Sequence, residues 1–214
     1  MIINPNPTAA ELAVLARMHA ISLPTSVITQ FGPNYMQDFY QFVATSPSES
    51  VFVARLHGEV VGGALLSTAP ATLSQRVLIG TRLAWRLFLS PRLALASAWE
   101  MLSERYSAHN AQGKPNAELF GIFVDEPFRS QGIGRKLLAA VETELQRRGF
   151  HDYFVRITDE VGNRASAFYL RAGFDEIGSV RIHGKRFRLL RKNLDCARVL
   201  QVEREVQKSG KTRT

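Results

Sequence analysis

One segment of this 214-residue chain limits the choice of fold more than any other, because it joins an apolar run at residues 118–124 to a long helix through a glycine-bearing loop. The helix is predicted over residues 132–149, and Gly149 is placed to end it. Its apolar side chains recur at the spacing of a single stripe: Ile133, Leu137, Leu138, Val141 and Leu145. A strand, a tight loop and an amphipathic helix in this order predict a sheet that is covered by helices.

The remaining sequence alternates between helical and extended patterns. Outside residues 68–116, four helices are predicted from apolar spacing and end signals, the first beginning with a Thr8–Glu11 capping box: residues 8–21, 35–43, 132–149 and 163–173. Six strands are predicted from apolar runs bounded by turn residues: residues 51–54, 60–66, 118–124, 153–157, 174–182 and 185–190. This order predicts an α/β (α+β) fold, in which a mixed sheet is flanked by helices.

The composition is that of a globular protein, with 45% hydrophobic and 21% charged residues. We expect a single domain over residues 1–192. The lone cysteine, Cys196, excludes a disulfide framework and a cysteine-based zinc site, and the five histidines show no metal-ligand spacing, so no metal is expected. The N-terminus has no secretory pattern, and arginines interrupt the longest apolar region. We therefore expect a cytoplasmic protein.

The positive charge is concentrated at the C-terminal end. Residues 1–180 contain 16 basic and 16 acidic side chains, whereas residues 181–214 contain 11 basic and 3 acidic ones. Residues 193–214 are predicted to form a basic helix or tail, which is either a solvated end or a contact for nucleic acid, an anionic membrane or an acidic partner. No aromatic residue follows Phe187, which argues against binding of single-stranded nucleic acid.

The loop before the long helix has the chemistry of an anion site. A helix start leaves several backbone N–H groups unpaired and carries a partial positive charge. Gly132 and Gly134 remove side chains that would keep a phosphate away from those groups, and Arg129 and Arg135 add charge. Leu137 and the residues around it match neither a P-loop nor a dinucleotide fingerprint. The loop is thus either a cradle for a diphosphate or a glycine turn that merely begins a helix.

Two motifs resemble those of one protein family. Arg129-x-x-Gly132-x-Gly134 after a strand resembles the acyl-CoA-binding motif of the GNAT superfamily of N-acetyltransferases. Residues 163–174 resemble the family's second signature, a helix that begins at an Asn, carries Phe-Tyr and ends in Gly-Phe. The resemblance covers about residues 117–192. It implies a GNAT-like mixed, largely antiparallel sheet flanked by helices, with acetyl-CoA as co-substrate.

The resemblance also implies roles for individual residues. Phe123 and Val124 would offer backbone groups to the pantetheine arm, which would lie like an extra strand beside an opened sheet. Asn163 would bind near the pantetheine or cap its own helix, and Phe168 would pack against the cofactor or the core. The pyrophosphate would be bound mostly by main-chain N–H groups along the loop: Arg129, Ser130, Gln131, Gly132, Ile133, Gly134 and Arg135.

Two further residues are candidates for the chemistry of transfer. Tyr169 would protonate the leaving thiolate, since a tyrosine of ordinary pKa, about 10, keeps its proton at neutral pH. Glu118 is the candidate base, acting on the acceptor amine through water. The alternatives are a half-buried aromatic residue for Tyr169 and a solvent-facing strand residue for Glu118. Direct transfer by proximity, without an acyl-enzyme, is expected.

A predicted helical insertion at about residues 68–116 departs from the family, whose members usually connect the third strand to the motif strand by a short turn. Its helices are predicted over residues 72–89 and 92–109. In one interpretation the insertion is a lid or a dimer element that shapes the acceptor pocket. In the other, its arginines form a face that lies on a membrane surface: Arg76, Arg82, Arg86 and Arg92. Liposome flotation would separate the two.

Two functions remain open from the sequence. The first is an N-acetyltransferase that moves an acetyl group from acetyl-CoA to an amine, and the second is a non-catalytic acyl-CoA-binding or regulatory module. The presence of Tyr169 and Glu118 favours the enzyme. The expected acceptor is a small-molecule amine or an amino sugar. A nucleic-acid partner is not expected, and a homodimer is left open.

Overall fold

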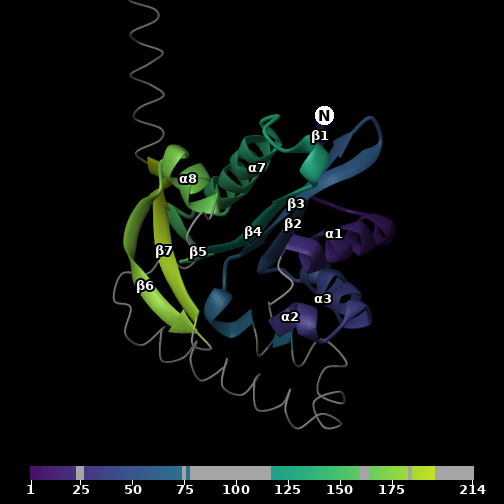
Figure 1. Ribbon diagram of the computed structural model, residues 1–214, viewed down its shortest axis with the longest axis horizontal. Coiled ribbons are helices and arrows are strands. Elements are labelled where there is room, and N and C mark those ends of the chain that lie inside the picture. The colour runs from purple at the N-terminus through teal and green to yellow at the C-terminus, as the bar shows by residue number, and fades with distance from the viewer. Residues whose placement is uncertain (23–26, 74–75, 78–116, 160–163, 183–184, 196–214) are drawn as a thin grey trace, which may run out of the picture.

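The computed structural model describes residues 1–22, 27–73, 76–77, 117–159, 164–182 and 185–195 (Figure 1). These residues form a seven-stranded sheet in the order β1-β2-β3-β4-β5-β7-β6. The strands are β1 (Ile2–Asn4), β2 (Glu49–Leu56), β3 (Glu59–Ser67), β4 (Glu118–Val124), β5 (Asp152–Thr158), β6 (Asp175–Ile182) and β7 (Lys185–Asn193). The helices are α1 (Ala9–Ser22), α2 (Val27–Gln30), α3 (Pro33–Thr45), α7 (Ile133–Arg147) and α8 (Arg164–Arg171), with 3-10 turns η1 (Pro70–Thr72) and η2 (Glu126–Phe128).

The sheet is mixed and largely antiparallel, which confirms the predicted fold class. Among the described strands, the pair β4–β5 is the parallel one, and it crosses over through α7. All other neighbouring strands pair antiparallel. Parallel neighbours need such a long crossover connection, whereas antiparallel neighbours can be joined by short turns.

Helices cover both faces of the sheet, as Figure 1 shows: α1 and α3 lie on one face, and α7 and α8 lie on the other. The predicted stripe of α7 is buried in the core of its face, together with Leu119, Val155 and Tyr169. Leu15 and Phe39 are buried in the second core, between the other face and helices α1 and α3. The two cores therefore hold β4 between them.

Local sequence signals explain most of the element boundaries. The predicted capping box begins α1, since Thr8 N–H donates to Glu11 Oε2 at 2.7 Å and Glu11 N–H donates to Thr8 Oγ1 at 3.4 Å. His57 and Gly58 have positive φ values of 52° and 89° in the turn between β2 and β3. The short elements β1 and α2 were not predicted. None of the described helices is long and apolar enough to cross a membrane.

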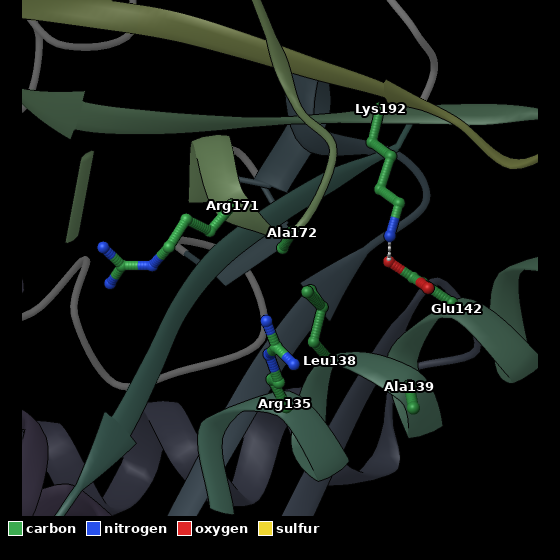
Figure 2. A pocket seen from close by; sticks show the side chains of 7 residues that line it. All are labelled: Arg135, Leu138, Ala139, Glu142, Arg171, Ala172 and Lys192. Carbon is green, nitrogen blue, oxygen red and sulfur yellow. Dashed lines mark hydrogen bonds and ion pairs between the residues drawn. The ribbon is translucent and has the colours of Figure 1, made fainter. Parts of the chain in front are cut away.

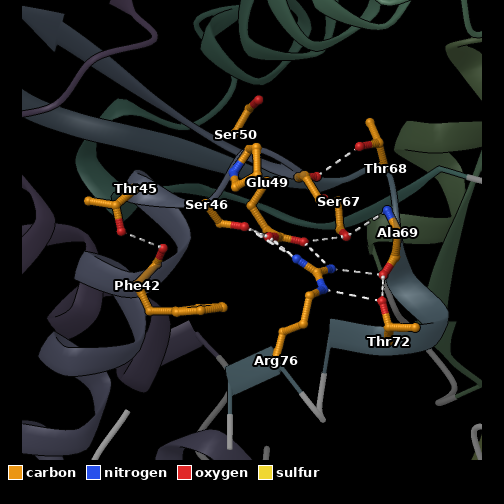
Figure 3. A network of polar contacts seen from close by, with 12 residues as sticks. Phe42, Thr45, Ser46, Glu49, Ser50, Ser67, Thr68, Ala69, Thr72 and Arg76 are labelled. Atoms are coloured by element: carbon orange, nitrogen blue, oxygen red, sulfur yellow. Dashed lines mark hydrogen bonds and ion pairs between the residues drawn. The ribbon is translucent and has the colours of Figure 1, made fainter. Parts of the chain in front are cut away.

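Most of the predicted insertion, Asn163 and the C-terminal tail beyond residue 195 lie outside the described residues. The first residues of the insertion are described, and they are fixed to the core by Glu49, whose side chain has no solvent exposure (Figure 3). Arg76 Nη1 and Nη2 donate to the two Glu49 carboxylate oxygens at 2.6 and 2.7 Å, and Ser67 Oγ donates at 2.7 Å. The predicted membrane-surface face therefore does not include Arg76, because its charge is used inside the protein.

Candidate active site

The sheet opens between its two central strands. β4 and β5 pair at two positions, Glu118 with Phe154 and Leu119 with Val155. Beyond Leu119, the remainder of β4 has no partner on the β5 side among the described strands. The register with β3 shifts at this point, so that Phe120 becomes the extra residue of a bulge. A bulge bends its strand and ends regular pairing, and β4 therefore presents a free edge.

The free edge carries unpaired backbone groups that can bind an extended ligand. Asp125 N–H donates to Val61 O on β3 at 3.0 Å. In an antiparallel pair the hydrogen-bonded positions alternate along the strand. Two residues before Asp125, the N–H and C=O groups of Phe123 therefore both point toward Gly63 on β3. The backbone groups of Ile122 and Val124 face away from β3. Val124 and Ile122 therefore lie on the free edge, whereas Phe123, whose backbone was predicted to bind the pantetheine arm, pairs with β3.

A group of exposed N–H donors lies next to this edge, in the loop between β4 and α7. The N–H groups of residues 130–135 have no hydrogen-bond acceptor within the described part of the chain, and the first intrahelical bond is Lys136 N–H to Gly132 O at 3.1 Å. Ser130 and Gly132 have positive φ values of 63° and 78°. Alternation with left-handed residues turns successive N–H groups toward one concave surface, which is the geometry of an anion-binding nest.

Side chains of the same loop hold it in this shape. Asp125 Oδ1 accepts from Glu126 N–H at 2.9 Å, and Gln131 Nε2 donates to Pro127 O at 3.2 Å. Arg129 Nε donates to Val124 O at 2.9 Å, which brings the guanidinium to the free edge of β4. The structure therefore brings the predicted Arg129–Arg135 loop together with Val124.

The two glycines of the motif, Gly132 and Gly134, lie in different surroundings. Gly132 has a left-handed backbone conformation, and a Cβ placed there would meet no other atom within 4 Å. Glycine is therefore favoured at this position by the backbone conformation and not by a lack of space. A Cβ at Gly134 would lie 3.4 Å from the ring of Phe168 and 4.0 Å from the side chain of Ile122. These are ordinary van der Waals distances, and they place the Phe168 ring against the first turn of α7, close to the free edge.

A cavity of about 430 Å³ lies between α7, α8 and β7, and it adjoins the loop before α7. Its lining residues are Arg135, Leu138, Ala139, Glu142, Arg171, Ala172 and Lys192 (Figure 2). Lys192 Nζ and Tyr153 Oη both donate to Glu142 Oε1, at 2.6 and 2.7 Å. Arg135 and Arg171 have no acidic partner among the residues that the structure describes, so this cavity can bind further negative charge.

The candidate acid, Tyr169, is buried in the core between the sheet and α7. Its ring packs edge-on against Phe168 and Phe174, with centroids 5.0 and 5.1 Å away. Burial raises the pKa of Tyr169 above its ordinary value. The hydroxyl therefore carries its proton at neutral pH.

The candidate base, Glu118, is buried at the first position of β4. Arg156 on β5 binds it through both carboxylate oxygens, with Nε 2.5 Å from Oε1 and Nη2 3.0 Å from Oε2. The same guanidinium carbon lies 5.8 Å from the centre of the Phe120 ring. The solvent-facing alternative for Glu118 does not hold, because this side chain is only 3% exposed. Arg156 was not predicted, because its partner comes from a strand far away in the sequence.

Comparison with known proteins assigns the family. The sequence profile of the acetyltransferase (GNAT) family matches residues 17–174, and the chain therefore belongs to that family. An acetyltransferase from Agrobacterium fabrum is 39% identical over 72 residues, which is 34% of this chain. The match covers 49% of that relative, so it spans about half of the relative's length.

Solved structures of the family share the fold at low sequence identity. A GNAT-family protein from Desulfovibrio desulfuricans matches with a TM-score of 0.60 at 14% identity, over 90% of this chain and 98% of that one. An aminoglycoside 6'-acetyltransferase type Ii gives 0.57 at 14% identity, over 91% and 97%. A ribosomal-protein-alanine N-acetyltransferase from Brucella melitensis gives 0.53 at 18% identity, over 90% and 99%.

Proposed function

We propose that this protein is a cytoplasmic, acetyl-CoA-dependent N-acetyltransferase that transfers the acetyl group directly to an amine. The observation that carries the proposal is the set of unpaired N–H groups at residues 130–135, next to the free edge of β4. A diphosphate fits the first feature, and an extended amide-containing arm fits the second. Coenzyme A contains both groups in one molecule.

The residues around the opening divide the binding of the cofactor between them. The N–H groups of the loop bind the pyrophosphate, and Arg129 adds a positive charge beside it. The backbone of Ile122 and the N–H group of Val124 bind the pantetheine amides, as a neighbouring strand would. Arg135 and Arg171 attract the phosphorylated nucleotide end into the adjoining cavity. This division is supported by where the unpaired donors lie, and Asn163 keeps its predicted contact near the pantetheine as part of the proposal.

Acetyl-CoA supplies the activated thioester, and the chain supplies position and protons. Phe168 packs beside the free edge, and Tyr169 donates a proton to the leaving thiolate. Burial raises the pKa of Tyr169, so its hydroxyl is protonated at neutral pH and a proton is present for the thiolate. Glu118 receives the proton of the acceptor amine through water, and Arg156 holds its carboxylate in place with two hydrogen bonds.

The acceptor that we propose is a small-molecule amine or an amino sugar. Two structural neighbours are named for different acceptors, one for an aminoglycoside and the other for a ribosomal protein. The fold alone therefore does not select between them. We favour a small acceptor because two aromatic residues of β4 lie at the free edge, the buried Phe123 and the half-buried Phe120.

Substitution of Tyr169 tests the catalytic part of the proposal. Tyr169→Phe removes the proton donor but keeps the ring, so we expect kcat for release of free coenzyme A to fall about tenfold or more. The affinity for acetyl-CoA should stay within twofold. Tyr153→Phe is the matched control, since Tyr153 is also a buried tyrosine of the same core but hydrogen-bonds Glu142. Equal turnover in the two variants would remove Tyr169 from the mechanism.

The wild-type protein decides between the enzyme and a binding module. Coenzyme A release with any amine from an acceptor screen supports the enzyme. Saturable binding of acetyl-CoA without release, over a broad screen of amines, would instead show a non-catalytic acyl-CoA-binding protein.

A further inference from the structure

His19, in the last turn of α1, is a buried polar residue that the proposed mechanism does not use. Its side chain is 5% exposed, and Nε2 is the one buried side-chain nitrogen or oxygen without a hydrogen-bond partner in the described part of the chain. The other ring nitrogen, Nδ1, lies 3.1 Å from Tyr40 Oη on α3. Buried polar atoms are almost always hydrogen-bonded, so an unpartnered one indicates a water or a ligand.

The imidazole packs against β4, the strand that borders the opening of the sheet. The ring stacks on Phe123 of β4, with centroids 4.9 Å apart and planes inclined by 29°. α3 packs against β2, whereas α1 packs against β3 and β4. Because Nδ1 faces Tyr40 and the two ring nitrogens face roughly opposite ways, Nε2 faces away from α3. It thus lies beside Phe123, on the face of β4 that α1 covers.

The position of His19 is opposite to that of the cofactor loop. The N–H groups of residues 130–135 belong to the face of the sheet that α7 covers, and His19 belongs to the face that α1 covers (Figure 1). A cofactor that enters from the α7 side and lies along β4 leaves its thioester open to attack from the α1 side. The acceptor must therefore approach over Phe123 and His19.

We infer that His19 Nε2 is an acceptor-binding group, which forms a hydrogen bond with the amine as it approaches the thioester. The inference rests on the proposed function, and it deepens that function by assigning the acceptor side of the site to α1 and Phe123. Burial lowers the pKa of His19 to about 4, so the imidazole is neutral at physiological pH and does not repel an ammonium group.

Two substitutions separate this role from a structural one. His19→Asn places an amide near the position of Nδ1, so it can keep the bond to Tyr40 but leaves nothing at Nε2. His19→Gln reaches the position of Nε2 and gives up the bond to Tyr40. We expect the amine KM of His19→Asn to rise about tenfold, which corresponds to one lost hydrogen bond, with partial rescue in His19→Gln. The Kd for acetyl-CoA should stay within twofold in both.

The assay uses named amines and a folding control. Wild-type and variant proteins are given saturating acetyl-CoA and glucosamine, tyramine, lysine or an alanine-initiated peptide, and free coenzyme A is measured. Tyr40→Phe removes the bond to Nδ1 alone and should leave the amine KM within about threefold of the wild-type value. If His19→Asn does not fold, ¹⁵N-imidazole NMR of the wild-type protein replaces it, and the Nε2 resonance should move when the best amine is added with coenzyme A.

The outcomes separate failure of the proposed function from failure of the His19 inference. A wild-type protein that does not bind acetyl-CoA, or that acetylates none of the amines, overturns the proposed function and this inference with it. A wild-type protein that acetylates an amine, while His19→Asn shows the same amine KM or the Nε2 resonance does not move, overturns the inference alone. In that case a buried water satisfies Nε2, and His19 is structural.

Discussion

Alanine substitution of two glycines at opposite ends of α7 separates backbone strain from cofactor binding. Gly132 precedes the helix and Gly149 follows it, and both have a φ of 78°. At both positions an added Cβ would meet no other atom within 4 Å. The two glycines therefore have the same conformation and the same free space, but only Gly132 belongs to the loop with the unpaired N–H groups.

The expected magnitudes follow from this equivalence. A non-glycine residue in the left-handed region costs about 1–2 kcal/mol, and neither site adds a steric term. In a chain of this size each kcal/mol lowers Tm by about 2–4 °C, so both variants should melt roughly 2–8 °C below the wild-type protein. Gly132→Ala should also weaken acetyl-CoA binding by about tenfold or more, because relief of the strain turns the N–H groups away from their common surface.

Calorimetric titration with acetyl-CoA and thermal melting of both variants provide the test. We expect similar losses of Tm, with a raised Kd in Gly132→Ala alone. If the two variants bind acetyl-CoA equally well, the loop before α7 does not bind the diphosphate, and the reasoning fails. A raised Kd in both would show that the stability of α7, rather than the loop, limits binding.

Three further predictions concern charged residues. Arg76→Ala leaves the carboxylate of Glu49 buried without its partner, so the free energy of unfolding should fall by about 3–5 kcal/mol. Chemical denaturation measures this change, and an unchanged midpoint would contradict the network in Figure 3. The hydrogen bond from Arg55 is the largest cause that lowers the pKa of Glu11 from 4.5 to about 2. The stability from this pair is therefore complete above pH 4.5 and is lost as the pH falls toward 2, and Glu11→Gln should remove that part of the acid unfolding curve. Arg171→Gln should raise the Kd for acetyl-CoA at low salt and have less effect at high salt; equal effects at both would argue against a charge contact.

The sequence patterns predicted the regular elements well where each element carries its own signal. The α7 stripe, the Thr8–Glu11 capping box and the strand before Asp125 are all encoded within a few turns or residues of the chain. β1 and α2 escaped prediction because three and four residues are too short to show a period. β1 forms as an edge strand only through its pairing with β2.

The candidate site was predictable only in its local part. The residues from Arg129 to Arg135 are contiguous, and their motif placed them before any contact was known. The free edge of β4 depends on how β4 and β5 pair, which no single segment encodes. The ion pair of Glu118 with Arg156 likewise joins neighbouring strands that are far apart in sequence.

Burial was the property that sequence patterns conveyed least. His19 looks like any other histidine of a helix, and its five-membered ring matters only because Tyr40 and Phe123 enclose it. Arg76 shows the same limit, since one interpretation of the sequence put it on a basic surface, whereas in the structure it binds the buried Glu49. Pairing across the fold therefore decided the role of both side chains.

The most direct test of the central idea is a ¹⁵N NMR titration of the full chain with acetyl-CoA. Glycine amides appear in a separate region of the spectrum, which makes four of them useful probes: Gly58, Gly132, Gly134 and Gly149. We expect the amide signals of Gly132 and Gly134 to shift and saturate together, while those of Gly58 and Gly149 stay in place. Signals of Gly132 and Gly134 that do not move at saturating acetyl-CoA would contradict this expectation.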